Sequence, residues 1–432
     1  MFVVGGKVMK ILFISQSPIN ASVSVGNTFL NIFEGIENVE FGSIYSKSGL
    51  PDARIKDAFR VDEKMLVKAL FGKKVGETVI ARYDGEMVLD GKVASFAKRK
   101  RWTIFFWGQN LIWRLPFWKS QRLKSFLDDY NPDIIFTVLS DSIPLNRIIR
   151  FVQNYTHKPL ALYAWDDNYS MQTSGASPLK KLNRLICRAS MRKTVKKASQ
   201  FYVISQIQKT EYEAWFQHDC KILTKSEDFS SVPCFKTNFG KPLRFVFTGN
   251  IGMNRWKSLG MIARVLKRIN SEGIKAQLYI YSGNMLTTEM QTMLQVENTS
   301  FFMGRVPANE IACLQEEADV LVHVEGLDKK SQREVHQSFS TKLVDYFKAA
   351  RPILAVGPQN VASIEHLREN NCAFLAETEE ELFEGLLTFL DDYEKLHILA
   401  RNAYECGKKN HDKTFMKQML ERDMLQLCEG NK

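Results

Sequence analysis

The residues from Arg244 to Leu259 combine side chains and a spacing that suit the binding of a phosphate group. Their sequence, RFVFTGNIGMNRWKSL, has an apolar strand pattern, a turn that contains Gly249 and Gly252, and then the basic residues Arg255 and Lys257. A helix that begins after such a turn presents backbone N–H groups, and adjacent Arg and Lys side chains add charged donors. The stretch therefore predicts a phosphate or diphosphate site.

This pattern differs from two common phosphate-binding motifs. The glycine spacing is not that of the dinucleotide fingerprint, and the stretch has no Gly-Lys-Ser or Gly-Lys-Thr triplet of a Walker loop. An ordinary strand, turn and helix with two surface cations explains the same residues, since local pattern is a weak guide to function. We expect the strand at 245–248 and the helix at 258–269, with Asn250 in the turn.

The N-terminal half opens with the strand, loop and helix order that positions ligands in α/β proteins. A strand is expected at 10–16, then a loop rich in Ser, Asn and Gly, then a helix near 27–35. This order is typical of the start of a doubly wound sheet. Gly26 is expected where the backbone approaches another group closely, or else it is an ordinary turn glycine.

Two adjacent carboxylates, Asp166 and Asp167, follow the strand expected at 159–165. Ligands of open α/β sheets bind at the carboxyl ends of the strands. The pair could therefore bind a metal, orient an acceptor hydroxyl or act as a base. An Asp that caps a following helix explains the pair as well. The order is Asp-Asp rather than Asp-x-Asp, which weakens the metal interpretation.

The C-terminal half repeats the alternation of strands and helices. After the first stretch, strands are expected at 276–282, 300–303, 318–324 and 352–356. A polar loop, 325–337, precedes a helix opened by Ser338, Ser340 and Thr341, and this helix N-terminus faces the carboxyl edge of the sheet. Lys342 and Asp345 lie one turn apart on it, so they can share a face.

The sequence therefore predicts an α/β protein with two Rossmann-like doubly wound domains. A chain of 432 residues is long enough for two or three domains. The polar, proline-containing stretch between the halves indicates a linker. We expect an N-terminal domain at 1–225, a linker at 226–242, a C-terminal domain at 243–410 and a helix at 411–432 that packs back on the N-terminal domain.

The net charge and the cysteines restrict the setting. The formal charge of +11 fits an anionic membrane surface, a nucleic acid or a polyanionic substrate. The seven cysteines are scattered and form no C-x-x-C pair, which is typical of reduced thiols in the cytosol. The first residues lack the pattern of a signal peptide, and we expect no membrane-spanning segment.

A basic and aromatic segment interrupts this ordinary composition. From 91 to 127 the chain has no Asp or Glu, and four of its seven tryptophans lie there. Trp and Phe favour the membrane interface and Lys and Arg favour anionic headgroups, so we expect residues 96–126 to lie on an anionic membrane surface. A core helix with basic ends and a nucleic-acid platform are the alternatives. A second basic run, in the helix expected at 177–199, fits a solvated face.

Three features in the C-terminal half resemble the GT-B glycosyltransferases. They are the turn FTGNIGMNRWKSL, the strand LVHV and the segment SFSTKLVDYFKAARPILAVG, which is similar to the helix type P-x-K-x-x-E-Y-x-A-x-G-K-P-V. The resemblance is strongest to the retaining family 4 (group 1) enzymes of bacterial capsule and O-antigen assembly, and it covers nearly the whole chain. It implies two Rossmann-like domains that face a central cleft.

The resemblance also implies an activity. A nucleotide-diphosphate sugar would bind the C-terminal domain, and a lipid-linked glycan or oligosaccharide acceptor would bind the N-terminal domain. Cations would stabilise the departing diphosphate, so neither a metal nor a cofactor beyond the donor is expected. Such a protein would work in cell-surface polysaccharide synthesis, in the cytoplasm at the inner face of the membrane, and would bind no nucleic acid. The expected catalytic residues are Asp166, Asp167, Arg255 and Lys257, and the expected donor-binding residues are Gly26, Gly249, Asn250, Gly252, Ser340, Thr341, Lys342 and Asp345.

The chain departs from the family pattern at several positions. Two glutamates eight residues apart are replaced by Gln337 and Asp345. Asp345 can accept hydrogen bonds from two ribose hydroxyls, whereas Gln337 interacts only as a neutral group. A histidine-bearing loop is replaced by Trp165-Asp166-Asp167, and Asn250 stands where a basic residue is common. A sugar-nucleotide epimerase, a glycogen-type synthase and a non-catalytic partner or nucleotide-binding subunit therefore stay open as alternatives.

Overall fold

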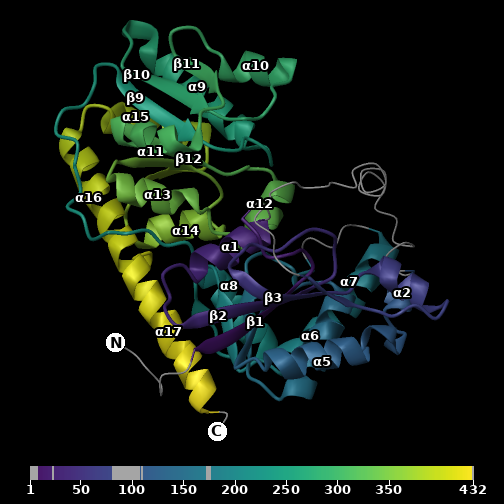
Figure 1. The fold of residues 1–432 in the computed structure, drawn as a ribbon. Coiled ribbons are helices and arrows are strands. Elements are labelled where there is room, and N and C mark those ends of the chain that lie inside the picture. Colours follow the sequence, from purple (N-terminus) through teal and green to yellow (C-terminus); the bar gives the residue numbers. More distant parts are fainter. Residues whose placement is uncertain (1–7, 22–23, 80–107, 109, 172–176, 431–432) are drawn as a thin grey trace. The chain divides into compact units, whose positions relative to one another are not determined.

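The computed structural model describes residues 8–21, 24–79, 108, 110–171 and 177–430, and the chain forms two compact units. The first unit contains residues 1–203, 212–221 and 417–432, and the second contains 204–211 and 222–416. Each unit has a central sheet with helices packed against it (Figure 1). The predicted α/β class with two doubly wound domains is confirmed.

The first unit is built on an eight-stranded sheet with the order β4-β3-β2-β1-β5-β6-β7-β8. β1 pairs in parallel with β2 and with β5, and only β4 is antiparallel to its neighbour among the described pairings. β5 and β6 are buried along their whole length, as expected for strands covered by helices on both faces. The strands are β1 Met9–Ser15, β2 Val39–Tyr45, β3 Ile55–Arg60, β4 Glu77–Val79, β5 Ile134–Val138, β6 Leu160–Ala164, β7 Gln200–Val203 and β8 Lys221–Ile222.

The second unit is built on a six-stranded sheet with the order β11-β10-β9-β12-β13-β14. β9 lies inside this sheet and pairs in parallel with β10 and β12, so its carboxyl end opens at the edge where the loops of its neighbours also leave. The strands are β9 Leu243–Thr248, β10 Ala276–Tyr281, β11 Ser300–Gly304, β12 Val320–Val324, β13 Ile353–Val356 and β14 Phe374–Ala376.

Side-chain alternation along the central strands of the second unit fills two apolar layers. Phe245 and Phe247 pack into the cluster on one face of the sheet, and Val246 packs into the cluster on the other face. Because successive side chains of a strand point to opposite faces, an uninterrupted apolar strand needs helices on both sides. The packing on both faces holds β9 in position, and it therefore also positions the turn that follows β9.

The helices of the chain cover these sheets. In the N-terminal half they are α1 Ser24–Ile32, α2 Glu63–Ala69, η1 Pro116–Trp118, α5 Gln121–Tyr130, α6 Ile143–Thr156, α7 Pro178–Val195 and α8 Gln206–Phe216. In the C-terminal half they are α9 Arg255–Ile269, η2 Asn270–Glu272, α10 Thr288–Leu294, α11 Ala308–Glu317, α12 Lys329–Val335, α13 Lys342–Ala349, α14 Ala362–Glu369, α15 Glu379–Phe389, α16 Tyr393–Asn410 and α17 Lys413–Glu429.

The end of the chain returns to the first unit. Asp423 of α17 is buried, and it accepts a hydrogen bond from the Tyr202 hydroxyl at 2.9 Å and pairs with Lys221 at 2.5 Å. Tyr202 lies on β7 and Lys221 on β8, so α17 is anchored to the edge of the N-terminal sheet. None of the helices within the described ranges is long and apolar enough to cross a bilayer.

Candidate donor-binding site in the second unit

The turn between β9 and α9 has the tight backbone that its glycines predict. Gly249 has φ +137°, and Met253 and Asn254 also have positive φ angles. The Asn250 side chain accepts a hydrogen bond from the amide of Gly252 at 2.6 Å, which closes the turn. The helix begins at Arg255 instead of the expected Ser258, because the turn ends at Asn254.

The first amides of α9 are already used inside the turn. The N–H groups of Arg255, Trp256 and Lys257 donate to the carbonyls of Gly252, Ile251 and Asn254 at 3.0–3.2 Å. These three amides therefore do not offer the open anion-binding end that the sequence suggests. An anion at this turn would depend mainly on cationic side chains.

Lys342 supplies such a side chain at the start of α13. A Cβ built on Gly249 would lie only 2.3 Å from Lys342 Nζ, so the absence of a side chain at Gly249 makes room for the ammonium group. The Nζ atom lies 4.7 Å from the centroid of the Phe247 ring. Among the described residues no hydrogen bond or ion pair holds it.

The electrostatic surroundings of Lys342 favour release of its proton. Burial, followed by the positive charge of Arg255, lowers the pKa of Lys342 to about 8, and the carboxylates of Glu325 and Asp345 oppose this shift only in part. A bound anion would reverse the effect, because an opposite charge stabilises the protonated amine.

Arg255 is held by a buried carboxylate that sequence reasoning missed. Glu325 Oε2 accepts a hydrogen bond from Arg255 Nε at 2.9 Å and lies 2.8 Å from its Nη2. The Glu325 side chain is only 2% exposed, and burial raises its pKa although Arg255 opposes the shift. The available signal was a charged residue directly after the strand at 318–324, on the edge where ligands bind.

His323 lies beside this pair on β12. Its Nε2 atom is 3.5 Å from Glu325 Oε1, and burial, then the charges of Lys342 and Arg255, lower the pKa of His323 well below its ordinary value. The imidazole is therefore neutral at pH 7. Arg255, Glu325, His323 and Lys342 form one electrostatically coupled group, which we call the β9 edge cluster.

The other expected cation, Lys257, lies outside this cluster. Its side chain is exposed, and its Nζ atom is 5.3 Å from the ring of the neighbouring Trp256. No carboxylate in the described part of the chain pairs with it. Lys257 is therefore free to meet an anion that arrives from solvent, but the structure does not bring it together with the Arg255–Glu325 pair.

Asp345 lies one turn after Lys342 on α13. Its carboxylate pairs with Lys225 at 2.5 Å. Burial raises the pKa of Asp345, against the influence of Lys225. The carboxylate is partly exposed, so it can still accept a ligand hydroxyl if Lys225 shifts.

The residues before α13 have mainly structural contacts. The Ser340 amide donates to Ser363 Oγ at 2.9 Å. Thr341 is exposed at the helix start and its hydroxyl caps no amide. The expected polar loop at 325–337 contains α12, which is stabilised by Asp328 Oδ1 accepting from the amides of Lys330 and Ser331 at 3.1 Å each.

Gln337 is an interior residue. It is fully buried, its Nε2 donates to Glu211 Oε2, and its Oε1 accepts from Gln208 Nε2 at 3.4 Å. His336 also contacts the Glu211 carboxylate, at 2.8 Å. Burial acts to raise the pKa of Glu211, but the bonds from His336 and Gln337 hold it below its usual value. Gln337 therefore joins segments of the second unit and offers no free group to a ribose.

The expected site residues of the first unit have local partners. Gly26 is required by the backbone of Asn20, because a Cβ at Gly26 would lie 2.2 Å from the Asn20 carbonyl oxygen. Asp167 accepts from the Ser170 amide at 2.8 Å and from the Ser170 hydroxyl, and so closes the loop after β6. Asp166 is exposed at the same edge.

The basic and aromatic segment lies partly outside the described residues. The structure describes residue 108 and residues 110–171, but not 80–107 or 109. Among the described residues, Trp113 and Trp118 are 0% and 3% exposed. Trp113 Nε1 donates to Glu63 at 3.1 Å, and Trp118 Nε1 donates to the Trp113 carbonyl at 3.1 Å. These two side chains belong to the core of the first unit and not to an exposed aromatic face. The expectation for Trp102 and Trp107 falls outside the described residues.

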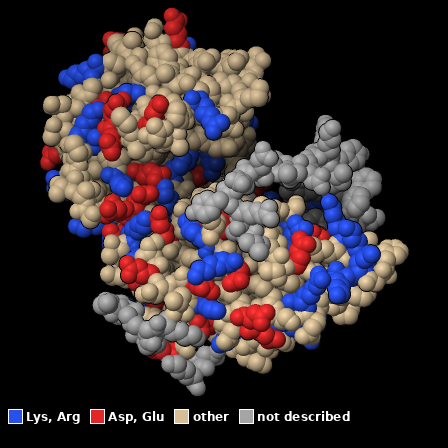
Figure 2. Space-filling model, viewed as in Figure 1, with Lys and Arg blue, Asp and Glu red and all other residues tan. Residues whose placement is uncertain are grey.

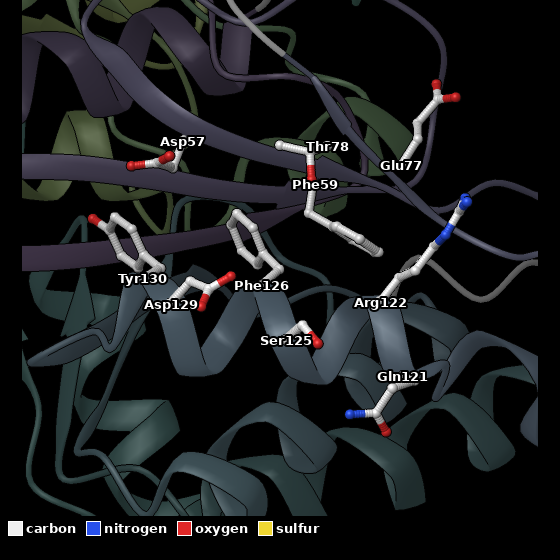
Figure 3. Close-up of a pocket in the computed structure, with 10 residues that line it drawn as sticks. All are labelled: Asp57, Phe59, Glu77, Thr78, Gln121, Arg122, Ser125, Phe126, Asp129 and Tyr130. Atoms are coloured by element: carbon white, nitrogen blue, oxygen red, sulfur yellow. The ribbon is translucent and has the colours of Figure 1, made fainter.

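The first unit also has a cavity that none of the predicted site residues lines. It has a volume of about 610 Å³ and lies between α5 and the strands β3 and β4 (Figure 3). Three of its four charged side chains are carboxylates, which would repel a diphosphate. The lining residues are Asp57, Phe59, Glu77, Thr78, Gln121, Arg122, Ser125, Phe126, Asp129 and Tyr130.

Residues 242–392 match the family model described as "Glycosyl transferases group 1". This match covers the β9 turn, the β9 edge cluster and α13. No curated protein matches the sequence.

Solved structures with similar folds span nearly the whole chain. HepE from Anabaena in complex with UDP is 12% identical, with a TM-score of 0.62 and coverage of 97% of this chain and 100% of that chain. Sucrose-phosphate synthase from Thermosynechococcus elongatus is 11% identical, with a TM-score of 0.59 and coverage of 98% and 100%. Trehalose 6-phosphate synthase from Burkholderia multivorans is 9% identical, with a TM-score of 0.61 and coverage of 98% of each chain. At these identities the similarity establishes the fold alone.

Proposed function

We propose that the chain transfers a sugar from a nucleotide-diphosphate donor with retention of configuration. The premise is that the chain is a GT-B glycosyltransferase whose residues 242–392 form a group 1 glycosyl transferase domain. The acceptor is a lipid-linked or oligosaccharide glycan of cell-surface polysaccharide synthesis. The reaction takes place in the cytoplasm, at the inner face of the membrane. HepE binds UDP and UDP-glucose, which supports a nucleotide sugar as the donor.

One observation carries the donor site. Lys342 Nζ lies in the space that Gly249 leaves open, without an ion-pair partner among the described residues. An ammonium group that is partly desolvated and unpaired is poised for an anion, because the anion restores the charge balance that burial disturbs. The turn after β9 lies at the sheet edge where α/β folds bind phosphates.

Cations stabilise the departing diphosphate in this proposal. The leaving group gains negative charge as the glycosidic bond breaks, and donors already aimed at it act without reorganisation. Lys342, beside Gly249, provides a partly buried positive charge (the inner cation), and Lys257 provides an exposed one (the outer cation). Arg255, fixed by Glu325 at 2.8–2.9 Å, contributes orientation more than net charge. One such donor is worth roughly 3 kcal/mol of transition-state stabilisation, so the proposal requires no metal ion.

The remaining expected residues take supporting roles. Asp345, which pairs with Lys225, accepts the ribose hydroxyls. Gly249, Asn250 and Gly252 shape the turn. On the first unit, exposed Asp166 orients the acceptor, and Asp167 holds the loop that presents it.

A thermal-shift screen against UDP, GDP, dTDP and CMP tests this function, since a ligand that binds only the native state raises the melting temperature by mass action. We expect one nucleoside diphosphate to give the largest shift. Product analysis with the matching nucleotide sugar, with and without an acceptor glycan, then distinguishes transfer from epimerisation. A lack of any shift would remove the donor-binding proposal.

A non-catalytic glycosyltransferase-like subunit is the second candidate. The burial of Gln337 against Glu211 favours it, because one of the two family carboxylates is replaced by a structural amide. Such a subunit would bind a nucleotide or a partner transferase and would turn over no donor.

A further inference from the structure

A second basic site lies in the first unit, on the outer side of α6. A cavity of about 580 Å³ opens there between η1 and α6. Four of its lining side chains are cationic and none is acidic. The lining residues are Trp113, Arg114, Pro116, Trp118, Lys119, Arg147, Arg150, Phe151 and Asn154. Figure 2 shows a band of Lys and Arg side chains on the side of the first unit where α2, α6 and α7 lie.

The charges of this cavity are not balanced within the described part of the chain. No ion pair there involves any of the four cations. The guanidinium of Arg150 donates to the Ser190 carbonyl and to Thr194 Oγ1, both at 2.8 Å, and Arg147 donates to the Asn110 carbonyl at 3.4 Å. These are neutral acceptors, so the positive charge persists.

Neighbouring cations act against one another in this cavity. Burial and then the charge of Arg114 lower the pKa of Arg147, while burial and then the charge of Arg147 lower the pKa of Arg150. Like charges held together in a concave surface concentrate a positive potential. An anion in the cavity would remove this repulsion and gain charge-assisted hydrogen bonds.

Two of the cationic groups, Arg147 and Arg150, are held in place by hydrogen bonds to carbonyl and hydroxyl oxygens. Lys119 Nζ lies 5.5 Å from the Trp118 ring and 5.4 Å from the Phe151 ring, and both rings line the cavity. The Trp118 side chain is buried, and its Nε1 donates a hydrogen bond to the Trp113 carbonyl. A site whose donors are held before the ligand arrives loses less conformational entropy on binding.

Exposed apolar side chains flank the cavity on the same segment. Leu111 is 64% exposed, and Leu115 and Phe117 are each 37% exposed. Leu115 and Phe117 adjoin Pro116, which lines the cavity. An apolar rim beside a basic cavity fits an amphiphilic anion better than a fully hydrated one.

We infer that this cavity is a binding site for a phosphate or diphosphate group, separate from the donor site of the second unit, and that the group is carried by a lipid. Arg114, Lys119, Arg147 and Arg150 bind the phosphate oxygens, and Leu111, Leu115 and Phe117 meet the lipid beside it. The inference does not depend on the transferase activity, because all of these residues belong to the first unit.

Hydrogen exchange of the full chain, followed by mass spectrometry, tests the inference with a local readout. One arm adds inorganic pyrophosphate, and the other adds vesicles of phosphatidylcholine with or without phosphatidylglycerol. The variant Lys119→Gln/Arg147→Gln removes two charges of the cavity. The control Lys193→Gln/Lys196→Gln removes the same net charge from exposed positions at the end of α7 that do not line the cavity.

We expect the peptides that cover 110–119 and 143–156 to be protected by vesicles that contain phosphatidylglycerol. The protection should fall at least tenfold in the Lys119→Gln/Arg147→Gln variant and persist in the control. Protection by pyrophosphate alone would confirm a phosphate site but overturn the lipid as its source. Equal loss in both variants would indicate a diffuse charge effect and overturn the site, as would an absence of protection in both arms.

Discussion

The ammonium group of Lys342 occupies the space where a side chain of Gly249 would lie, since a Cβ there would be 2.3 Å from Nζ. This relationship joins the β9 turn to the start of α13, although the two residues are 93 positions apart (342 minus 249). Position 249 therefore requires glycine for two reasons. Its φ of +137° disfavours other residues, and a side chain there would collide with the Lys342 ammonium group.

Substitution of Gly249 should therefore damage binding more than folding. In Gly249→Ala, the positive φ costs roughly 1–3 kcal/mol of unfolding free energy, and the new methyl group displaces Lys342. Gly273→Ala is the matched control, because Gly273 has a φ of +141° and no atom lies within 4 Å of the place that its new methyl group would take. We expect similar denaturation midpoints for the two variants but at least tenfold weaker nucleoside-diphosphate binding only in Gly249→Ala. Equal affinities would contradict the placement of Lys342.

Donor affinity should fall as the pH rises through about 8. The pKa of Lys342 is about 8, so the charged form that binds an anion is present below this pH and is lost above it. Titration calorimetry of the nucleoside diphosphate between about pH 7 and 9 measures the trend. In Lys342→Gln the affinity should be lower and nearly independent of pH over this window. A wild-type affinity that is flat across it would argue against an anion at Lys342.

The same pKa shift makes the stability of the fold change with pH in the direction opposite to the donor affinity. Folding lowers the pKa of Lys342, so above about pH 8 the unfolded chain binds the extra proton and the native state is favoured as the pH rises. Above about pH 8, the contribution of Lys342 to the free energy of unfolding should therefore rise with pH, while the affinity for the nucleoside diphosphate falls.

Removal of the outer cation should lower turnover with little effect on folding. Lys257 is exposed, and within the described ranges the Trp256 ring is its one close partner, so Lys257→Ala loses few native contacts. We expect turnover to fall by about two orders of magnitude, as for the loss of one transition-state donor, with an unchanged melting temperature. Lys267→Ala, which removes an exposed charge from the last turn of the same helix, should leave turnover unchanged. Near wild-type turnover in Lys257→Ala would exclude Lys257 from the site.

Substitution of Gln337 by glutamate, the residue that the resemblance implies at this position, should destabilise the protein. Gln337→Glu would place two carboxylates together in the interior, because Gln337 is fully buried against Glu211. We expect a loss of roughly 3 kcal/mol in unfolding free energy at pH 7. The double variant Glu211→Gln/Gln337→Glu restores one amide and one carboxylate and should recover most of it, which a double-mutant cycle measures. A stable Gln337→Glu variant with tighter donor binding would instead show that this side chain reaches the ligand.

Apolar strands made most of the fold predictable from sequence. β9, β12 and β13 are mostly apolar runs between polar turns, and a parallel sheet buried on both faces requires this pattern. α12 was missed because its seven residues, KKSQREV, carry too little apolar periodicity to stand out from a polar loop. Its one signal is Asp328 at the N-cap position.

The candidate site was predictable only in part, because its contacts are tertiary. The glycine turn and Lys342 were predicted as separate features, and only the fold places them together. Glu325, Glu211 and Lys225 hold Arg255, Gln337 and Asp345, yet these partners are distant in sequence. The tryptophans show the same limit, since a composition that favours an interface does not reveal that Trp113 and Trp118 are buried.

The most direct test of the donor site is calorimetric titration of wild type and Lys342→Gln with the best nucleoside diphosphate of the thermal-shift screen and with the matching nucleoside. We predict that Lys342→Gln weakens diphosphate binding at least tenfold at pH 7 and leaves nucleoside binding unchanged. Equal diphosphate affinities in the two proteins would contradict the account that Lys342, at the Gly249 turn, binds the diphosphate of a sugar donor.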